Sequence, residues 1–215
     1  MAEHALSDPK NPTRATPNIK AEDAICQIGS STFITAPPTK IWDALINTST
    51  WPTWNKFIPR VTIVAQPNIT SITTTSDDLS ETPTTLSPIL QNGTRMIFHV
   101  LMDPTSPKEK FTDTSLVVTK FEPPNSEAGS PGRIVWSSDF EAKDTFSPWL
   151  LTAEREHEIR AVEGGSEVRN WENQIGYLAY VVKWMYGSQL DFNFGLWIEG
   201  LKRFAEGDEG HDGEI

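Results

Sequence analysis

One histidine and one glutamate in the segment "EHEIRAVEGGSEVRNWEN", residues 156–173, have the side chains and the spacing for proton transfer. The segment is typical of two strands joined at Gly164-Gly165, because glycine pairs favour two-residue hairpin turns. A turn centred there places His157 opposite Glu172. Opposed residues have Cβ atoms about 4.5–5.5 Å apart, within reach of an imidazole–carboxylate hydrogen bond. A four-residue loop keeps this pairing, whereas a three-residue loop breaks it.

The hairpin has one apolar face, because strand side chains alternate between the two sides of a sheet. The residues that share this face are His157, Ile159, Ala161, Val168, Asn170 and Glu172. Arg155 and Gln174 form the next opposed pair on it and are candidate ligand-binding residues, with Ile159 and Asn170. The other face is expected to be mostly solvated and carries Glu158, Arg160, Arg169 and Trp171.

In a water-poor site, two effects act on the pKa of His157 in opposite directions. A neighbouring carboxylate raises a histidine pKa, whereas desolvation lowers it. If the two effects leave the pKa of His157 near 7, the imidazole is suited to act as a general acid or base. The same pair also fits a structural contact between two half-buried polar groups, or a group that orients a ligand without chemistry. The residues alone leave these interpretations open.

Hydrophobic periodicity predicts the elements that position the hairpin. Strands are expected at 27–36, 60–66, 94–102, 115–122 and 132–141, and short helices at 36–47 and 49–59. A long helix is expected at 177–206, with an apolar stripe formed by Leu190, Phe194, Trp197, Leu201 and Phe204. Gly187 is a candidate kink. One strand, two short helices, about six strands and a long helix indicate an α+β domain with an antiparallel sheet packed on the last helix.

Polar segments flank and interrupt this domain, which is expected to span residues 25–206. Residues 1–24 have few large apolar side chains and are expected to form a flexible tail. Residues 207–215 are expected to form an acidic tail. Residues 67–92, rich in Thr, Ser, Pro and Asp, are typical of a disordered loop or a lid.

Four motifs in this order resemble the START-like superfamily, also called Bet v 1-like or SRPBCC, and its polyketide cyclase/dehydrase-like branch. They are "ITAPPTKIWDALINTSTWPTWN", "GRIVWSS", "EREHEIRAVEGGSEVRNWENQIG" and the closing helix with "LKRFAE". The resemblance covers about residues 28–206. It implies a helix-grip fold, in which a strongly bent antiparallel sheet wraps around the C-terminal helix and encloses a deep apolar cavity. Members bind sterols, lipids, polyketides or plant metabolites, some as carriers and others as cyclases, dehydratases or isomerases.

The aromatic residues outside the hairpin divide into ligand-site candidates and core. Trp136 is expected to line the cavity, and Trp54 to lie near its entrance with Trp51 and Trp149. Tyr177, at the start of the last helix, is expected to present its hydroxyl to a ligand. Three further tryptophans are expected in the core, namely Trp42, Trp184 and Trp197. His99 is expected to be exposed, because Met96, Phe98 and Val100 form the more apolar face of their strand.

Composition excludes several classes of partner. The chain has 18 Lys and Arg against 29 Asp and Glu, a net charge of −11 that repels a nucleic-acid backbone. No apolar run is long enough to span a membrane, and the first residues lack the apolar core of a secretory signal. Cys26 is the only cysteine, which excludes an intrachain disulfide and favours a cytoplasmic protein. No metal-ligand spacing, phosphate loop, dinucleotide fingerprint or catalytic triad is recognisable, so neither a metal nor a cofactor is expected.

These features predict a protein that encloses a hydrophobic small molecule, with the oligomeric state left open. The first hypothesis is a cofactor-free cyclase, dehydratase or isomerase of secondary metabolism, acting on a polyketide- or terpenoid-like substrate. His157 would transfer a proton and Glu172 would orient it, while confinement alone could supply much of the rate. The alternative is a non-catalytic carrier or sensor of a sterol, fatty acid or similar lipid.

Overall fold

The computed structural model describes residues 14–67 and 86–207 of the chain. Its strands are β1 (Cys26–Ile34), β2 (Arg60–Ala65), β3 (Arg95–Leu101), β4 (Phe111–Glu122), β5 (Gly132–Ser138), β6 (Thr152–Val162) and β7 (Gly165–Ile175). Its helices are α1 (Pro38–Ile46), the 3-10 turn η1 (Thr48–Thr50), α2 (Trp51–Trp54) and α3 (Tyr177–Glu206). This order of elements, and with it the α+β class, confirms the expectation from the sequence.

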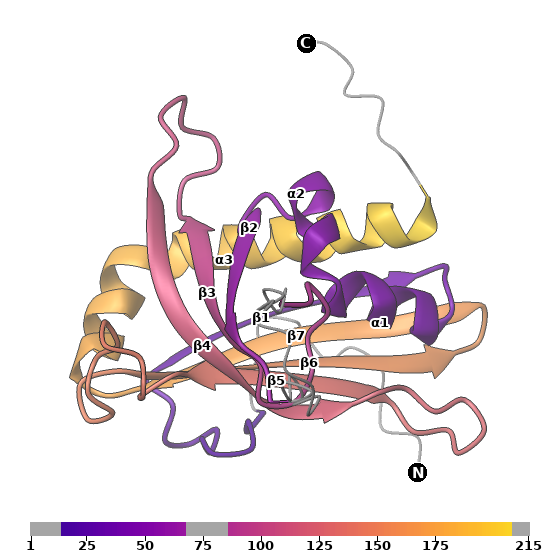
Figure 1. Cartoon of the computed structure of the whole chain (residues 1–215), viewed down its shortest axis with the longest axis horizontal. Coiled ribbons are helices and arrows are strands. Elements are labelled where there is room, and N and C mark those ends of the chain that lie inside the picture. Colours follow the sequence, from indigo (N-terminus) through magenta and orange to yellow (C-terminus); the bar gives the residue numbers. More distant parts are fainter. Residues whose placement is uncertain (1–13, 68–85, 208–215) are drawn as a thin grey trace, which may run out of the picture.

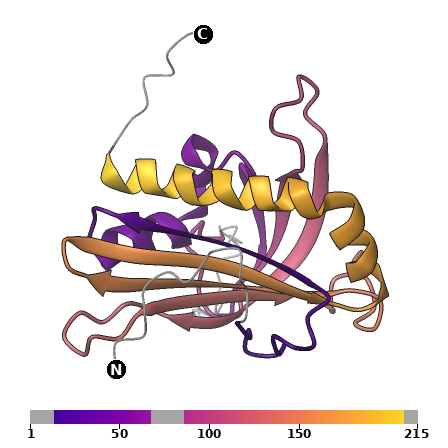
Figure 2. The ribbon, with the colours of Figure 1, turned by 180° about the vertical axis from the view of Figure 1, so that it is seen from behind.

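All seven strands belong to one antiparallel sheet with the order β1-β7-β6-β5-β4-β3-β2. β1 and β2 therefore form opposite edges, and α1 and α2 carry the chain from one edge to the other. The sheet is strongly bent, and α3 runs across its concave side (Figures 1 and 2). Register shifts interrupt the β2–β3 and β4–β5 pairings, and such bulges increase the local bend and twist of a sheet. This is the helix-grip fold that the resemblance implies.

The core lies between the concave face of the sheet and the second half of α3. The expected stripe supplies it, since Leu190, Phe194, Trp197 and Leu201 are buried, whereas Phe204 is exposed. α3 bends within its first half, which contains Gly187 (Figure 2). Trp184 lies in that half and is 84% exposed, so the expectation that it belongs to the core is wrong. The spacing of Trp184 along the helix is that of a core residue, but the first half of α3 does not pack this side chain against the sheet.

Residues 14–25 pack on the outer face of β6 and β7, where a flexible tail was expected. The main chain and side-chain amide of Asn18 donate hydrogen bonds of 2.8 and 2.7 Å to the Glu154 carboxylate. The indole of Trp171 donates to the carbonyl of Ala15 at 3.3 Å. Ile19 is buried in the same segment. The rest of the expected tails, residues 1–13 and 208–215, and most of the expected lid, residues 68–85, lie outside the described residues.

The outer face of the hairpin is consequently not solvated as expected. Trp171 is buried beneath the N-terminal segment, and the charged residues Glu158 and Arg169 are buried as well. Glu158 forms ion pairs with Arg133 at 2.6 Å and Arg160 at 3.4 Å, so its charge is compensated. Both faces of this part of the sheet therefore belong to the interior. Within the described residues, no helix is long and apolar enough to cross a bilayer.

At Gly200 α3 approaches α2 closely, and a Cβ there would lie 2.2 Å from the carbonyl oxygen of Trp54. We expect Gly200→Ala to lower the free energy of unfolding by about 1–3 kcal/mol, because the helices must separate to make room. Urea denaturation measures the change. Gly195→Ala is the matched control, since a Cβ there meets no atom within 4 Å. It should stabilise the helix by about 0.5–1 kcal/mol. Equal effects of the two substitutions would contradict the close helix contact.

Candidate functional site

The hairpin between β6 and β7 turns one residue earlier than the sequence suggested. Val162 pairs with Gly165, so Glu163 and Gly164 form the two-residue turn. Gly164 has a φ of +79°, a backbone conformation that glycine adopts without steric cost. The glycine pair therefore marks the turn correctly, but only its first member lies within it.

This shift of the turn changes every cross-strand partner by two residues. His157 lies opposite Asn170, and Arg155 lies opposite Glu172. The expected pairs His157–Glu172 and Arg155–Gln174 are therefore wrong, and Gln174 lies opposite Ala153 instead. A shift of two keeps each side chain on its face, because strand side chains alternate with a period of two. The expected polar residues thus share the inner face, in a different pairing.

His157 lies at the centre of the inner face and is completely buried. Its ring is flanked by Trp136 of β5 and Trp197 of α3, with centroid distances of 4.3 and 4.6 Å. Neither imidazole nitrogen has a hydrogen-bond partner within residues 14–67 and 86–207. Burial, and secondarily the positive charge of Arg155, hold the pKa of His157 well below its usual value of 6.5. The imidazole is therefore uncharged at neutral pH.

Polar atoms around this ring share its lack of partners. The indole N–H groups of Trp136 and Trp197 and both amide atoms of Asn170 are buried without a hydrogen bond to any described residue. We call these four residues, His157, Asn170, Trp136 and Trp197, the His157 cluster. Buried polar groups are nearly always hydrogen-bonded, and each exception needs an explanation such as bound water or a ligand. The cluster offers both donors and an acceptor to such a molecule.

A buried ion pair lies next to the cluster on the same face. The guanidinium of Arg155 donates from Nε and Nη2 to Oε2 of Glu172, at 2.8 and 2.7 Å. Gln174 donates from Nε2 to the other oxygen of Glu172 at 2.6 Å. The guanidinium carbon lies 4.1 Å from the ring centroid of Phe194, a cation–π contact. Glu172 therefore holds Arg155 in place and does not orient His157.

The other residues expected in the site have different fates. Ile159 is fully buried beside the cluster, and Trp54 is buried in α2 with its ring 5.7 Å from that of Trp197. Tyr177 is 71% exposed and contacts Trp149, because the first half of α3 does not reach the site. His99 lies on the outer face of β3 and bonds Thr62 and Asp113 through its two ring nitrogens.

Sequence reasoning missed two site residues on α3, which it assigned to the core. Trp197 flanks the imidazole, and Phe194 contacts the Arg155 guanidinium. A signal existed for Trp197, because an indole N–H placed in an apolar helical stripe needs a hydrogen-bond partner. For Phe194 the residue type gave no signal beyond packing.

The single cysteine adjoins the ion pair without becoming a nucleophile. Cys26 is buried opposite Gln174. Burial, together with the charge of Glu172, raises the pKa of the thiol from 9.0 to about 11. The thiolate is the reactive form of cysteine. Cys26 therefore remains an unreactive thiol at neutral pH.

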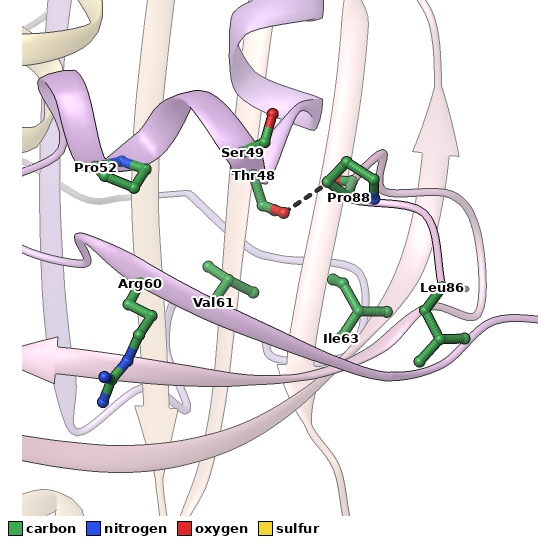
Figure 3. A pocket seen from close by; sticks show the side chains of 8 residues that line it. All are labelled: Thr48, Ser49, Pro52, Arg60, Val61, Ile63, Leu86 and Pro88. Carbon is green, nitrogen blue, oxygen red and sulfur yellow. Dashed lines mark hydrogen bonds between the residues drawn. The ribbon is translucent and has the colours of Figure 1, made fainter. Parts of the chain in front are cut away.

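A separate pocket of about 350 Å³ lies between the η1–α2 region and β2 (Figure 3). It is lined by Thr48, Ser49, Pro52, Arg60, Val61, Ile63, Leu86 and Pro88. The Thr48 hydroxyl donates to the carbonyl of Pro88 at 2.8 Å and joins η1 to the segment that precedes β3. None of the residues expected in the site from the sequence lines this pocket.

Comparisons with known proteins agree with this architecture. A family model described as polyketide cyclase / dehydrase and lipid transport matches residues 26–170. Oxopyrrolidines biosynthesis cluster protein O of Penicillium oxalicum is 37% identical over 201 residues, covering 90% of this chain and 93% of the relative.

Two solved structures are similar in fold. A hypothetical protein of Helicobacter pylori has a TM-score of 0.62 at 14% identity, covering 95% of this chain and 99% of that one. The di-domain ARO/CYC StfQ from the steffimycin biosynthetic pathway has a TM-score of 0.54 at 12% identity, covering 87% of this chain and 53% of that one. The family match spans more than half of the chain, and the sheet and helix carry the fold that the resemblance implied. The chain belongs to the polyketide cyclase/dehydrase and lipid transport family.

Proposed function

We propose that this protein binds a hydrophobic, oxygen-bearing small molecule at the His157 cluster and transforms it without a cofactor. The reaction would be a cyclisation, dehydration or isomerisation of a polyketide- or terpenoid-like compound, within the lyase or isomerase classes. One observation carries the proposal: a fully buried, uncharged imidazole whose two nitrogens have no partner in the described parts of the chain. A group that serves only packing would normally have its hydrogen bonds satisfied.

An uncharged imidazole can move a proton without becoming an ion. One ring nitrogen carries a hydrogen and the other a lone pair. The lone pair would take a proton from the carbon beside a ligand carbonyl, while the other nitrogen gives its hydrogen to the carbonyl oxygen. The C–H bond breaks, an O–H bond forms, and the ring ends as its other tautomer. This enolisation is an isomerisation by itself and prepares the carbon for ring closure.

The surrounding residues would assist by stabilising the oxygen and excluding water. The indole N–H groups of Trp136 and Trp197 and the amide of Asn170 are buried donors without partners in the described residues. Donors already fixed in a dry site stabilise developing negative charge on oxygen effectively. Trp54 and Ile159 would contribute apolar surface against the ligand. Glu172, expected to orient His157, would instead fix Arg155.

The biosynthetic setting is supported by the relatives. The Penicillium oxalicum relative is named for a biosynthesis cluster, and StfQ is an ARO/CYC of a biosynthetic pathway. A cytoplasmic location is part of the same proposal. The competing function is a carrier of a lipid-like molecule, and the family description itself includes lipid transport. The flanking of His157 by two indole rings would serve such binding equally well.

Replacing His157 by Gln separates the enzyme from the carrier. The protein is incubated with a metabolite extract of its source organism, and chromatography with mass spectrometry follows retained, consumed and newly formed compounds. Retention time is read beside mass, because cyclisation and isomerisation leave mass unchanged. We expect His157→Gln to lower turnover about 100-fold or more while the ligand is still retained, since glutamine cannot relay a proton.

His99→Gln is the matched control, because His99 lies on the outer face with both nitrogens bonded. It should leave turnover unchanged. Equal turnover of the wild type and His157→Gln would contradict proton transfer by His157. A compound that is retained one per chain and chemically unaltered would establish the carrier instead.

The pH dependence of stability tests whether His157 is uncharged in the fold. As pH falls through 6.5, the unfolded chain protonates this histidine before the folded chain does, because the pKa of buried His157 is held well below 6.5. His157 thus makes unfolding easier as pH falls, by at most about 1.4 kcal/mol per pH unit. Glu156 acts oppositely: burial raises its pKa from 4.5 to about 7, so the fold gains relative stability as pH falls through that window.

The two contributions oppose each other in the wild type, and His157→Gln removes only the first. We expect urea denaturation between pH 6.5 and 5 to show the variant gaining stability relative to the wild type as pH falls. The slopes of unfolding free energy against pH should differ between the two proteins by up to about 1.4 kcal/mol per pH unit, which corresponds to one proton. Parallel slopes would show that His157 titrates alike in the folded and unfolded chains.

A further inference from the structure

We propose that the inner face selects uncharged ligands over carboxylates because Glu172 neutralises the charge of Arg155, and that Arg155 binds a second ligand oxygen through its remaining donor. The inference deepens the proposed function and rests on it, since it assumes that a ligand occupies the His157 cluster. Three observations carry it: the hydrogen bonds left unmade at the ion pair, the balance of charge on the inner face, and the spacing of Arg155 from His157.

The charges of Arg155 and Glu172 cancel, but two buried polar atoms at this ion pair have no hydrogen bond to a described residue. Nη1 of Arg155 is buried without a hydrogen-bond partner among the described residues, and so is Oε1 of Gln174. Arg155, Glu172 and Gln174 are each more than nine-tenths buried. The carboxylate and the Phe194 ring hold the guanidinium in one position. A fixed donor and a fixed acceptor thus remain for a ligand, such as a carbonyl on Nη1 and a hydroxyl on Gln174.

The charges on this face already cancel. Arg155 and Glu172 are the charged side chains buried on the inner face of β5, β6 and β7 in the described parts of the chain. His157 adds no charge at neutral pH, because its pKa is depressed. A ligand carboxylate would lose its hydration and find the guanidinium already neutralised by Glu172. Burying such an uncompensated charge is costly, whereas a carbonyl needs only a hydrogen bond.

Arg155 and His157 present two separate points of attachment. They are two residues apart on one strand and project from the same face, so their backbone positions lie about 6–7 Å apart. A ligand that reaches both must carry two oxygen functions separated by several bonds. The ligand class is therefore an uncharged compound with at least two carbonyl or hydroxyl groups, in preference to a free acid.

Two probes of nearly the same shape test the selection. 6-Hydroxy-2-acetylnaphthalene is an uncharged ketone with a second, distant oxygen, and 6-hydroxy-2-naphthoate carries a carboxylate in place of the ketone. Isothermal calorimetry at pH 7.5 measures the binding. Tryptophan fluorescence is less suitable, because the exposed indoles of Trp149 and Trp184 would also respond to probe bound at the surface. We expect the wild type to bind the ketone about tenfold or more tightly than the carboxylate, because only the carboxylate enters as an unpaired charge.

Glu172→Gln should change this preference without removing the site. It leaves the Arg155 charge unneutralised, so the affinity for 6-hydroxy-2-naphthoate relative to that for the ketone should rise about tenfold or more. The double variant Arg155→Met/Glu172→Gln keeps the face uncharged and removes the Nη1 donor. It should weaken ketone binding and leave carboxylate binding weak, and it remains informative if the single variant fails to fold.

The outcomes distinguish this inference from the proposed function. If the wild type binds both probes equally, or Glu172→Gln leaves their ratio unchanged, selection by charge is overturned, while proton transfer by His157 stands on its own variant. If the double variant binds the ketone as the wild type does, Arg155 does not contact the ligand and its role is overturned. If neither probe binds any of these proteins, the inference and the interior binding on which it rests are both contradicted.

Discussion

The pairing of β6 with β7 determines which polar side chains meet inside the sheet. With Glu163 and Gly164 in the turn, Arg155 faces Glu172, and His157 faces Asn170. The first pair satisfies two opposite charges, and the second leaves an imidazole and an amide without partners in the described residues. One fewer residue or one more on either strand would send these groups to the outer face. The chemistry of the interior therefore depends on the backbone register more than on any single side chain.

The register also explains why His157 is uncharged. Its cross-strand neighbour is an amide, and its charged neighbour on the same face of β6 is the guanidinium of Arg155. Burial and that positive charge both lower the pKa of His157, so no balance near neutrality arises. A depressed pKa disfavours the imidazolium as an intermediate and favours a relay between tautomers. The ion pair thus holds a hydrogen-bond donor in place, whereas the histidine would move a proton.

Much of the architecture could be predicted from the sequence because it follows from local patterns. Alternation in residues 156–173 identified the inner face correctly, and the spacing of Leu190, Phe194 and Trp197 identified the buried side of α3. The exact turn could not be predicted, because Gly164-Gly165 fits a hairpin centred on either side of Gly164. Because strand side chains alternate, this error left each residue on the predicted face but gave it the wrong cross-strand partner.

Other failures came from contacts that no local pattern contains. The outer face of the hairpin is buried because residues 14–25, far away in sequence, pack on it. Trp184 fits a helical stripe and is exposed because that half of α3 does not lie on the sheet. The missing hydrogen bonds of the His157 cluster depend on four elements of tertiary structure meeting. Such features follow from the three-dimensional arrangement and not from residue type or spacing.

The proposed proton relay requires that the protein hold His157 uncharged inside the sheet. The most direct measurement is the pH dependence of histidine side-chain nitrogen chemical shifts by NMR, with the His157 signals assigned by their loss in His157→Gln. We expect the titration midpoint of His157 to lie well below 6.5, because burial and the charge of Arg155 disfavour its imidazolium. A midpoint near 6.5 or above would contradict it, and would mean that water or a negative charge reaches the ring.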